Sequence, residues 1–212
     1  MTATRPARRS FRSFALPAAI LVLLAAMAID TRVVRIGSPT ATQPGTFSAA
    51  DYGRSEFPKV RAAIEGRAVD AATLTAAIAR DPAAASKQYG VAASGGAEMA
   101  VRFTGVAGKE DAGVYDVAVA GVPDTLAIRV QTGPAINGTD LRDAAGTISF
   151  GQFTNQIAYQ NAGAALNKEM KRQVLAKVDA GKLAGKTISV VGVFQLVSPE
   201  SWLVTPVTLD VP

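Results

Sequence analysis

The chain has 212 residues, enough for one domain with a substantial hydrophobic core. It contains no cysteine and no histidine, which excludes disulfides, zinc sites of the Cys/His type, thiol nucleophiles and Ser-His-Asp triads within these residues. Four of the 22 basic residues and none of the 17 acidic ones lie in residues 1–28. The rest of the chain therefore carries a net charge of only +1, so no nucleic-acid partner is expected.

An uncharged hydrophobic run covers residues 14–29 and follows four arginines, Arg5, Arg8, Arg9 and Arg12. Positive charge before such a run keeps the N-terminus in the cytoplasm, so the rest of the chain is directed to the periplasm. Two outcomes fit the pattern. Residues 14–29 can stay as an uncleaved signal anchor that holds a single-pass protein in the inner membrane. Alternatively, cleavage at Ala28 releases a soluble periplasmic protein. We expect the anchor.

Residues 30–50 are predicted to form a strand over residues 30–36 and then a linker rich in Gly, Ser, Thr and Pro. A helical lead-in over residues 51–96 follows. Its first helix is indicated by apolar residues at helical spacing, namely Phe57, Val60 and Ile64. Pro58 predicts a break or a new first turn within it.

Two further helices are indicated by their N-terminal residues. Asp70 is a good N-cap for a helix over residues 71–80. Asp81, followed by proline, predicts another short helix over residues 83–88. Residues 91–96 are predicted to be a loop.

Residues 97–212 are predicted to form a barrel domain. Apolar residues alternate with others over residues 99–132, which indicates three antiparallel strands joined by short turns. An amphipathic helix containing Leu166, Met170, Val174 and Val178 precedes two more strands, at residues 187–197 and 203–211. The order β-β-β-α-β-β is that of an oligonucleotide/oligosaccharide-binding (OB) barrel. We therefore predict an α+β protein with an OB-like antiparallel β-barrel, and residues 51–212 as one compact unit.

The segment between the third strand and the long helix concentrates amides, hydroxyls and carboxylates between glycines. Such groups both donate and accept hydrogen bonds, so they can line a ligand groove. The candidate ligand-binding residues are Gln131, Asn137, Thr139, Asp140, Arg142, Asp143, Thr154, Asn155 and Gln156. A structural role also fits: Thr139 capping a helical turn, Asp140 pairing with Arg142 or Arg129, and Asn155 and Gln156 bonding their own backbone at the start of the long helix. A brief strand is expected at residues 148–150.

Catalysis is not expected. Asp140 and Asp143 lie three residues apart, but no nucleophile and no glycine-rich phosphate loop accompanies them. A hydrolase that uses either carboxylate is therefore the least favoured interpretation, and no catalytic residue, metal or cofactor is assigned. Trp202, Phe150, Phe153 and Tyr159 could stack on a sugar ring, although packing in or around the core is expected for each.

The same segment carries a family resemblance. Residues 131–143, 148–150 and 153–157 resemble the signature of the domain of unknown function 2291 family of predicted periplasmic lipoproteins. Supporting stretches lie at residues 69–74, 87–90, 165–167, 185–187 and 204–207. The resemblance implies an envelope location. It also implies an accessory role in uptake, since members are often encoded beside sugar-type ABC importers. The chain has no cysteine to carry a lipid, so its anchor would be the hydrophobic segment.

Together these features predict a non-enzymatic, periplasm-facing accessory or binding protein linked to sugar-type ABC transport. The expected partners are the inner membrane, a component of an ABC transporter and a small sugar-like solute. The alternative is a structural or protein-interaction module of the cell envelope, in which the polar segment contacts a partner protein.

Overall fold

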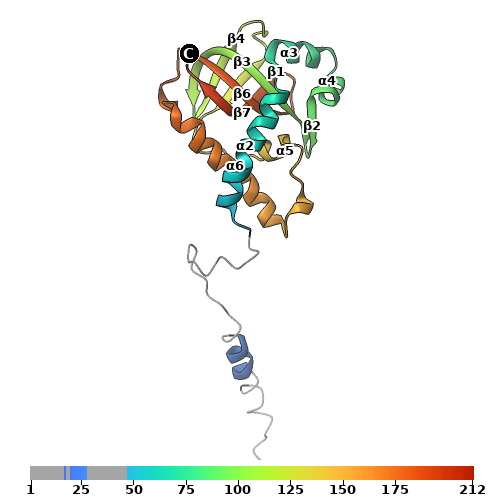
Figure 1. The fold of residues 1–212 in the computed structure, drawn as a ribbon, viewed down its shortest axis with the longest axis vertical. Coiled ribbons are helices and arrows are strands. Elements are labelled where there is room, and N and C mark those ends of the chain that lie inside the picture. The colour runs from blue at the N-terminus through green and yellow to red at the C-terminus, as the bar shows by residue number, and fades with distance from the viewer. Residues whose placement is uncertain (1–16, 18–19, 28–46) are drawn as a thin grey trace, which may run out of the picture. The chain divides into compact units, whose positions relative to one another are not determined.

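The computed structural model describes residues 17, 20–27 and 47–212. Residues 20–27 are helical. Within the described part of the chain, no helix is long and apolar enough to cross a membrane. The rest of the 14–29 anchor and the strand at residues 30–36 lie outside the described residues, so both stay predictions. The chain from Phe47 to Pro212 forms one compact unit, to which the following description applies (Figure 1).

Helix α2 (Ala49–Arg67) opens this domain and buries Phe57, Val60 and Ile64 on one face. The predicted break at Pro58 is wrong, because the helix continues through it. Pro58 is exposed. Water can therefore bind the carbonyl that its missing N–H leaves free, while the buried face keeps the helix in one piece.

Helices α3 (Ala71–Arg80) and α4 (Pro82–Tyr89) begin where their caps predict. The carboxylate of Asp70 accepts hydrogen bonds from two backbone N–H groups of α3, and Asp81 does the same for α4. The predicted loop after α4 is partly wrong, because strand β2 (Gly90–Ala93) forms a tight hairpin with the strand that follows. Local periodicity is too short there to reveal a four-residue strand.

Five strands form a closed circuit of hydrogen-bonded pairs: β3 (Gly96–Asp111), β4 (Val114–Val119), β5 (Ala127–Gln131), β6 (Thr187–Leu196) and β7 (Ser201–Asp210). The pairs run β3–β4–β5–β7–β6 and return to β3. This is the predicted succession of three strands, a helical connection and two strands. One pairing departs from the predicted antiparallel arrangement: β5 and β7 are parallel, because β6 already reverses the chain between them.

Strand β3 closes the circuit because it pairs with strands on both sides. It runs antiparallel to β6 from Ala97 to Val106 and to β4 from Gly105 to Asp111. A Cβ atom at Gly105 would lie 2.5 Å from the carbonyl oxygen of Ala118, so a larger residue would force the two strands apart. Strand β1 (Val69–Asp70) adds a short parallel pairing to β3.

The interior of the circuit is apolar. Trp202 of β7 stacks on Phe194 of β6 with ring centroids 4.4 Å apart, and both side chains are fully buried. Trp202 is thus a core residue that cannot stack on a solute at the surface.

The connection between β5 and β6 is helical. It contains α5 (Asp140–Ala144) and the long helix α6 (Gln156–Gln173). The strand predicted at residues 148–150 is wrong, because Phe150–Gln152 is a 3-10 helix. The Gln152 side chain accepts a hydrogen bond from the Ser149 N–H and so holds that turn. Helix α6 ends before Val178, and 3-10 turns follow it.

Helices α2 and α6 pack directly on each other beside the strands (Figure 1). Gly53 of α2 makes the contact close, because a Cβ atom there would lie 2.8 Å from the carbonyl oxygen of Ala165 in α6. Gly66, in the same helix, has no atom within 4 Å of the position of a Cβ atom. The two glycines therefore differ only in what surrounds them.

Replacing Gly53 by alanine should push α2 and α6 apart and lower the free energy of unfolding by about 1–3 kcal/mol. Replacing Gly66 by alanine should raise it by about 0.5–1 kcal/mol, because alanine loses less backbone entropy in a helix. Urea unfolding of both variants measures the difference. Equal effects of the two substitutions would show that Gly53 does not set the helix contact.

Candidate functional site

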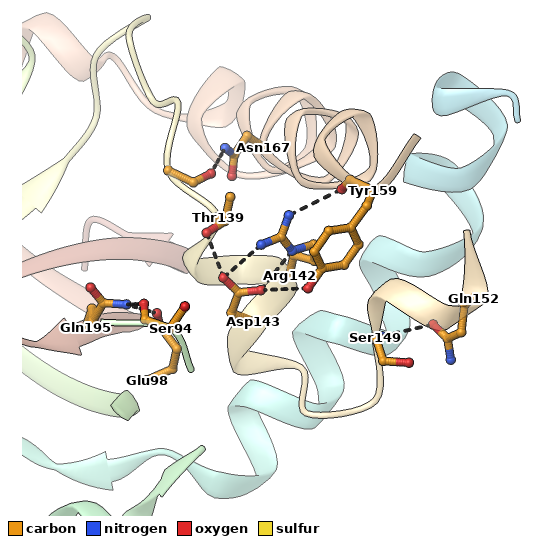
Figure 2. Close-up of polar contacts among 11 residues, drawn as sticks. Ser94, Glu98, Thr139, Arg142, Asp143, Ser149, Gln152, Tyr159, Asn167 and Gln195 are labelled. Atoms are coloured by element: carbon orange, nitrogen blue, oxygen red, sulfur yellow. Dashed lines mark hydrogen bonds and ion pairs between the residues drawn. The ribbon is translucent and has the colours of Figure 1, made fainter. Parts of the chain in front are cut away.

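Helix α5 brings the charged residues of the predicted segment to the junction of the strands with α6 (Figure 2). Arg142 is buried and binds Asp143 through two hydrogen bonds, of 2.8 and 3.0 Å. It also donates to the carbonyl oxygen of Tyr159, 3.3 Å away, and its guanidinium carbon lies 3.7 Å from the centre of the Tyr159 ring. The Thr139 hydroxyl donates to Asp143 at 2.6 Å. Arg142 thus joins α5 to α6.

The predicted pairing of Asp140 with Arg142 or Arg129 is not the one observed. Asp140 instead accepts a hydrogen bond of 2.8 Å from the Thr205 hydroxyl of β7. Thr205 in turn accepts one of 2.8 Å from the side-chain amide of Gln131. Burial raises the pKa of Asp140, while the bond from Thr205 acts in the opposite direction. This chain of bonds ties α5 to the end of β5 and to the middle of β7.

The remaining predicted residues lie apart from this network, on the surface. Asn137 is exposed in the loop before α5, and Thr154 and Gln156 are exposed on either side of the α6 N-cap. Asn155 is that N-cap, since its side-chain oxygen accepts a 2.8 Å hydrogen bond from the Ala158 N–H. The structure therefore brings together five of the nine candidate residues, Gln131, Thr139, Asp140, Arg142 and Asp143, in bonds with protein groups.

Glu98 of β3 belongs to the same region and was missed by the sequence analysis. It is 2% exposed. One carboxylate oxygen accepts a 3.1 Å hydrogen bond from Gln195, and the other, Oε2, is buried without a hydrogen-bond partner (Figure 2). Burial, together with the negative charge of Asp140, raises the pKa of Glu98 to about 8. Within the described chain, no cluster of three or more acidic side chains is arranged to hold a metal ion.

One sequence signal could have pointed to Glu98. It is the only charged residue between Lys87 and Arg102, in a run of small and apolar residues. A lone charge in such a run is either exposed at a turn or buried with a special role. Whether Glu98 is exposed or buried depends on the packing of β2 and α5 against β3. The local sequence pattern does not reveal that packing.

An open hollow lies elsewhere, on β4, β5 and the turn that joins them. Its volume is about 530 Å³, and it is lined by residues 116–128. Valine, alanine, leucine and proline form most of its wall, and the carboxylates are those of Asp116 and Asp124. Both aspartates are exposed. The volume falls within the range of about 300–1,000 Å³ that small-molecule sites occupy.

The strand circuit places the protein in the class of OB folds. It is similar to an OB-fold protein of Thermotoga maritima known from a crystal structure, with a TM-score of 0.62 and 20% sequence identity over 79% of this chain and 99% of that one. At this identity the likeness concerns the fold alone.

Within that class, residues 18–210 match the family model of a predicted periplasmic lipoprotein, DUF2291. The chain belongs to this family, as its resemblance predicted, and the periplasmic location follows from the family description. No curated protein is significantly similar to the chain. The family description contains no activity, so the site residues carry no role from it.

The raised pKa of Glu98 predicts a pH-dependent stability. Between the unfolded value of 4.5 and the folded value of about 8, the folded protein holds a proton that the unfolded chain has lost. The free energy of unfolding should therefore fall as the pH rises through this window, by up to about 1.4 kcal/mol per pH unit. The variant Glu98→Gln should lose this slope in urea unfolding.

The matched control for Glu98→Gln is Glu200→Gln, since Glu200 is exposed in the β6–β7 turn. Its pH profile should follow that of the wild type. If the free energy of unfolding of Glu98→Gln falls in parallel with that of the wild type from pH 5 to pH 8, the pKa of Glu98 is not raised by folding.

The Arg142 ion pair allows a second test. Arg142→Met should cost about 3–5 kcal/mol, because it leaves the largely buried Asp143 carboxylate without its counter-charge. The control is Arg54→Met, because the side chains of Arg54 and of its partner Asp51 are 58% and 71% exposed. That change should cost less than about 1 kcal/mol. If both variants lose a similar amount of stability in thermal unfolding, the buried Arg142–Asp143 ion pair is not what joins α5 to α6.

Proposed function

We propose that the protein is a non-enzymatic, periplasm-facing binding protein that assists a sugar-type ABC importer. Residues 14–29 hold it at the inner membrane as an uncleaved anchor. On β4 and β5, the folded domain presents a binding site for a small solute that is rich in hydroxyl groups.

The β4–β5 hollow carries this proposal. OB folds bind oligonucleotides and oligosaccharides on the face of their second and third strands, and β4 and β5 occupy these places in the circuit. Here the hollow holds the carboxylates of Asp116, on β4, and of Asp124, in the turn between β4 and β5. Carboxylates accept hydrogen bonds from sugar hydroxyls and repel phosphates. The charge therefore favours a neutral sugar-like ligand over a nucleic acid.

The polar network of α5 supports a non-enzymatic role. Asp140 and Asp143 both accept hydrogen bonds from protein side chains, and Arg142 is committed to Asp143 and Tyr159. Acid–base catalysis needs a carboxyl group that reaches the substrate. In this arrangement the carboxylates instead fix α5 against the strands and α6.

The membrane attachment is argued from the sequence. The family is described as lipoproteins, yet the 212 residues contain no cysteine that could carry a lipid. The hydrophobic residues 14–29 supply the alternative attachment. The link with a sugar importer comes from the family resemblance, because members of the family are often encoded beside such transporters.

The solute site predicts a sugar-dependent rise in melting temperature. A thermal-shift screen against neutral mono- and disaccharides should give saturable stabilisation of the wild type. The double variant Asp116→Asn/Asp124→Asn should lose this stabilisation by sugar. Without sugar its melting temperature should equal that of the wild type, because both side chains are exposed. The control Glu200→Gln should respond as the wild type does. No shift with any sugar would rule out a neutral sugar ligand.

The transport link has a separate test. A clean deletion strain should lose part of its uptake of the sugar that the proposed partner importer carries, and the plasmid-borne wild-type chain should restore it. Unchanged uptake would contradict the accessory role. Mass spectrometry of the mature N-terminus should find the uncleaved chain, whereas a start at residue 29 would show cleavage at Ala28 and a soluble protein.

One observation favours a second function, that of a protein-interaction module. Asn137 is exposed in the loop before α5, Thr154 in the loop before α6, and Gln156 in the first turn of α6. In that case a membrane pull-down recovers a transporter subunit, while the sugar screen returns nothing.

A further inference from the structure

The end of the domain where the chain enters carries an aromatic cluster, which consists of Phe47, Tyr52, Phe150, Phe153 and Tyr159. Neighbouring rings contact one another with centroids 5.3 to 5.7 Å apart. The rings come from the start of α2, the 3-10 helix and the start of α6. These segments lie together at one end of the domain (Figure 1).

This cluster opens onto an apolar surface. Phe150 is 50% exposed, and Ile157, in the first turn of α6, is 70% exposed. Phe47 and Phe153 are half-buried. From Ala144 to Asn167 the chain has no charged residue. Large apolar side chains exposed together without charges mark a surface that contacts a membrane or another protein.

A groove of about 600 Å³ between α2 and α6 also begins at this end, beside the first residues of α2. Three cations line it: Arg54, Lys168 and Arg172. Arg54 contacts Asp51, and Arg172 contacts Glu169. The groove region therefore keeps a small positive excess, which suits anionic headgroups.

The connectivity of the chain decides between the possible occupants. Phe47, the first residue of the domain, is itself part of the aromatic cluster. Only residues 30–46 separate it from the hydrophobic run at 14–29, a distance of at most about 60 Å even for a fully extended chain. If residues 14–29 lie in the inner membrane, the aromatic end is the part of the domain that the shortest stretch of chain joins to the lipid.

We propose that this end of the domain rests directly on the phospholipid surface, with Phe150 and Ile157 inserted at the boundary between headgroups and acyl chains. Aromatic rings favour that boundary because they combine an apolar body with a polar edge or hydroxyl. Two inserted side chains bind lipid weakly by themselves. The tether makes the contact intramolecular and raises the effective concentration of lipid at the domain. This inference rests on the membrane attachment proposed above.

Such docking orients the ligand hollow. Gly121 of the β4–β5 turn lies beside Ala72, just beyond the C-terminal end of α2. The aromatic cluster lies at the N-terminal end of α2, and nineteen helical residues span about 28 Å. The docked domain therefore turns its β4–β5 face away from the lipid, where a periplasmic solute can reach it.

Spin labels test this directly, because the chain has no native cysteine. The full-length variants Phe150→Cys, Ile157→Cys and Asp124→Cys would each be labelled with a nitroxide and reconstituted into phosphatidylethanolamine/phosphatidylglycerol vesicles. Flotation establishes attachment, and collision with oxygen or with a water-soluble nickel chelate reports the surroundings of each label. Oxygen collisions should dominate at residues 150 and 157, and nickel collisions at the exposed control residue 124. Circular dichroism of each variant checks its fold.

Three other outcomes overturn the proposal in different ways. Floating protein whose labels at 150 and 157 collide mainly with nickel removes the lipid contact and leaves the anchor and the proposed function intact. Low collision rates with both reagents would show that protein, either a partner or the chain's own N-terminal segment, covers the surface. Failure to float removes the anchor as well. Sugar binding and uptake are measured separately, so their failure leaves the lipid contact standing.

Discussion

The pairing of β3 with strands on both of its sides is the constraint on which the domain depends. Without the β3–β6 pairing, the five strands would form an open sheet with two edges. Closure satisfies the backbone groups of both edges and encloses Trp202 and Phe194. Gly105 allows β3 to approach β4 closely at the point where the two pairings overlap. Helices α2 to α5 of the domain contact its strands, and α6 packs on α2 and α5.

A second constraint is the junction of α5 with the strands. Charged groups are costly to bury, and Arg142 offsets that cost through its bidentate contact with Asp143 and its packing on the Tyr159 ring. Glu98 is treated differently, because one of its oxygens has no hydrogen-bond partner. Its raised pKa keeps it protonated at neutral pH, so the fold buries a neutral acid in place of an unpaired charge.

Membership of a lipoprotein family and the lack of cysteine can be reconciled physically. A lipid on an N-terminal cysteine and a hydrophobic helix both attach a domain to the membrane. The proposed contact of Phe150 and Ile157 with lipid would add orientation to attachment. A tethered domain that keeps one face towards the membrane leaves the β4–β5 surface available to the periplasm at all times. A tethered domain that rotates freely exposes this surface to the periplasm for only part of the time.

Features that depend on neighbouring residues could be predicted from the sequence alone. Asp70 and Asp81 place the starts of α3 and α4, because capping involves only the next three residues. Alternation located the five main strands, and their order indicated the OB connectivity. Asn155 was correctly predicted to bind nearby backbone at the start of α6, since its side chain accepts a hydrogen bond from the Ala158 N–H. Charge counting and the absence of cysteine and histidine needed no structure at all.

Only the tertiary structure decided which distant groups meet. The partner of Arg142 proved to be Asp143, because Thr205 of β7 takes up Asp140. The burial of Glu98 and the assembly of the aromatic cluster from residues 47–52 and 150–159 depend on contacts between residues far apart in sequence. Local periodicity carries no information on such contacts, because it specifies which face of an element is apolar and not what that face packs against.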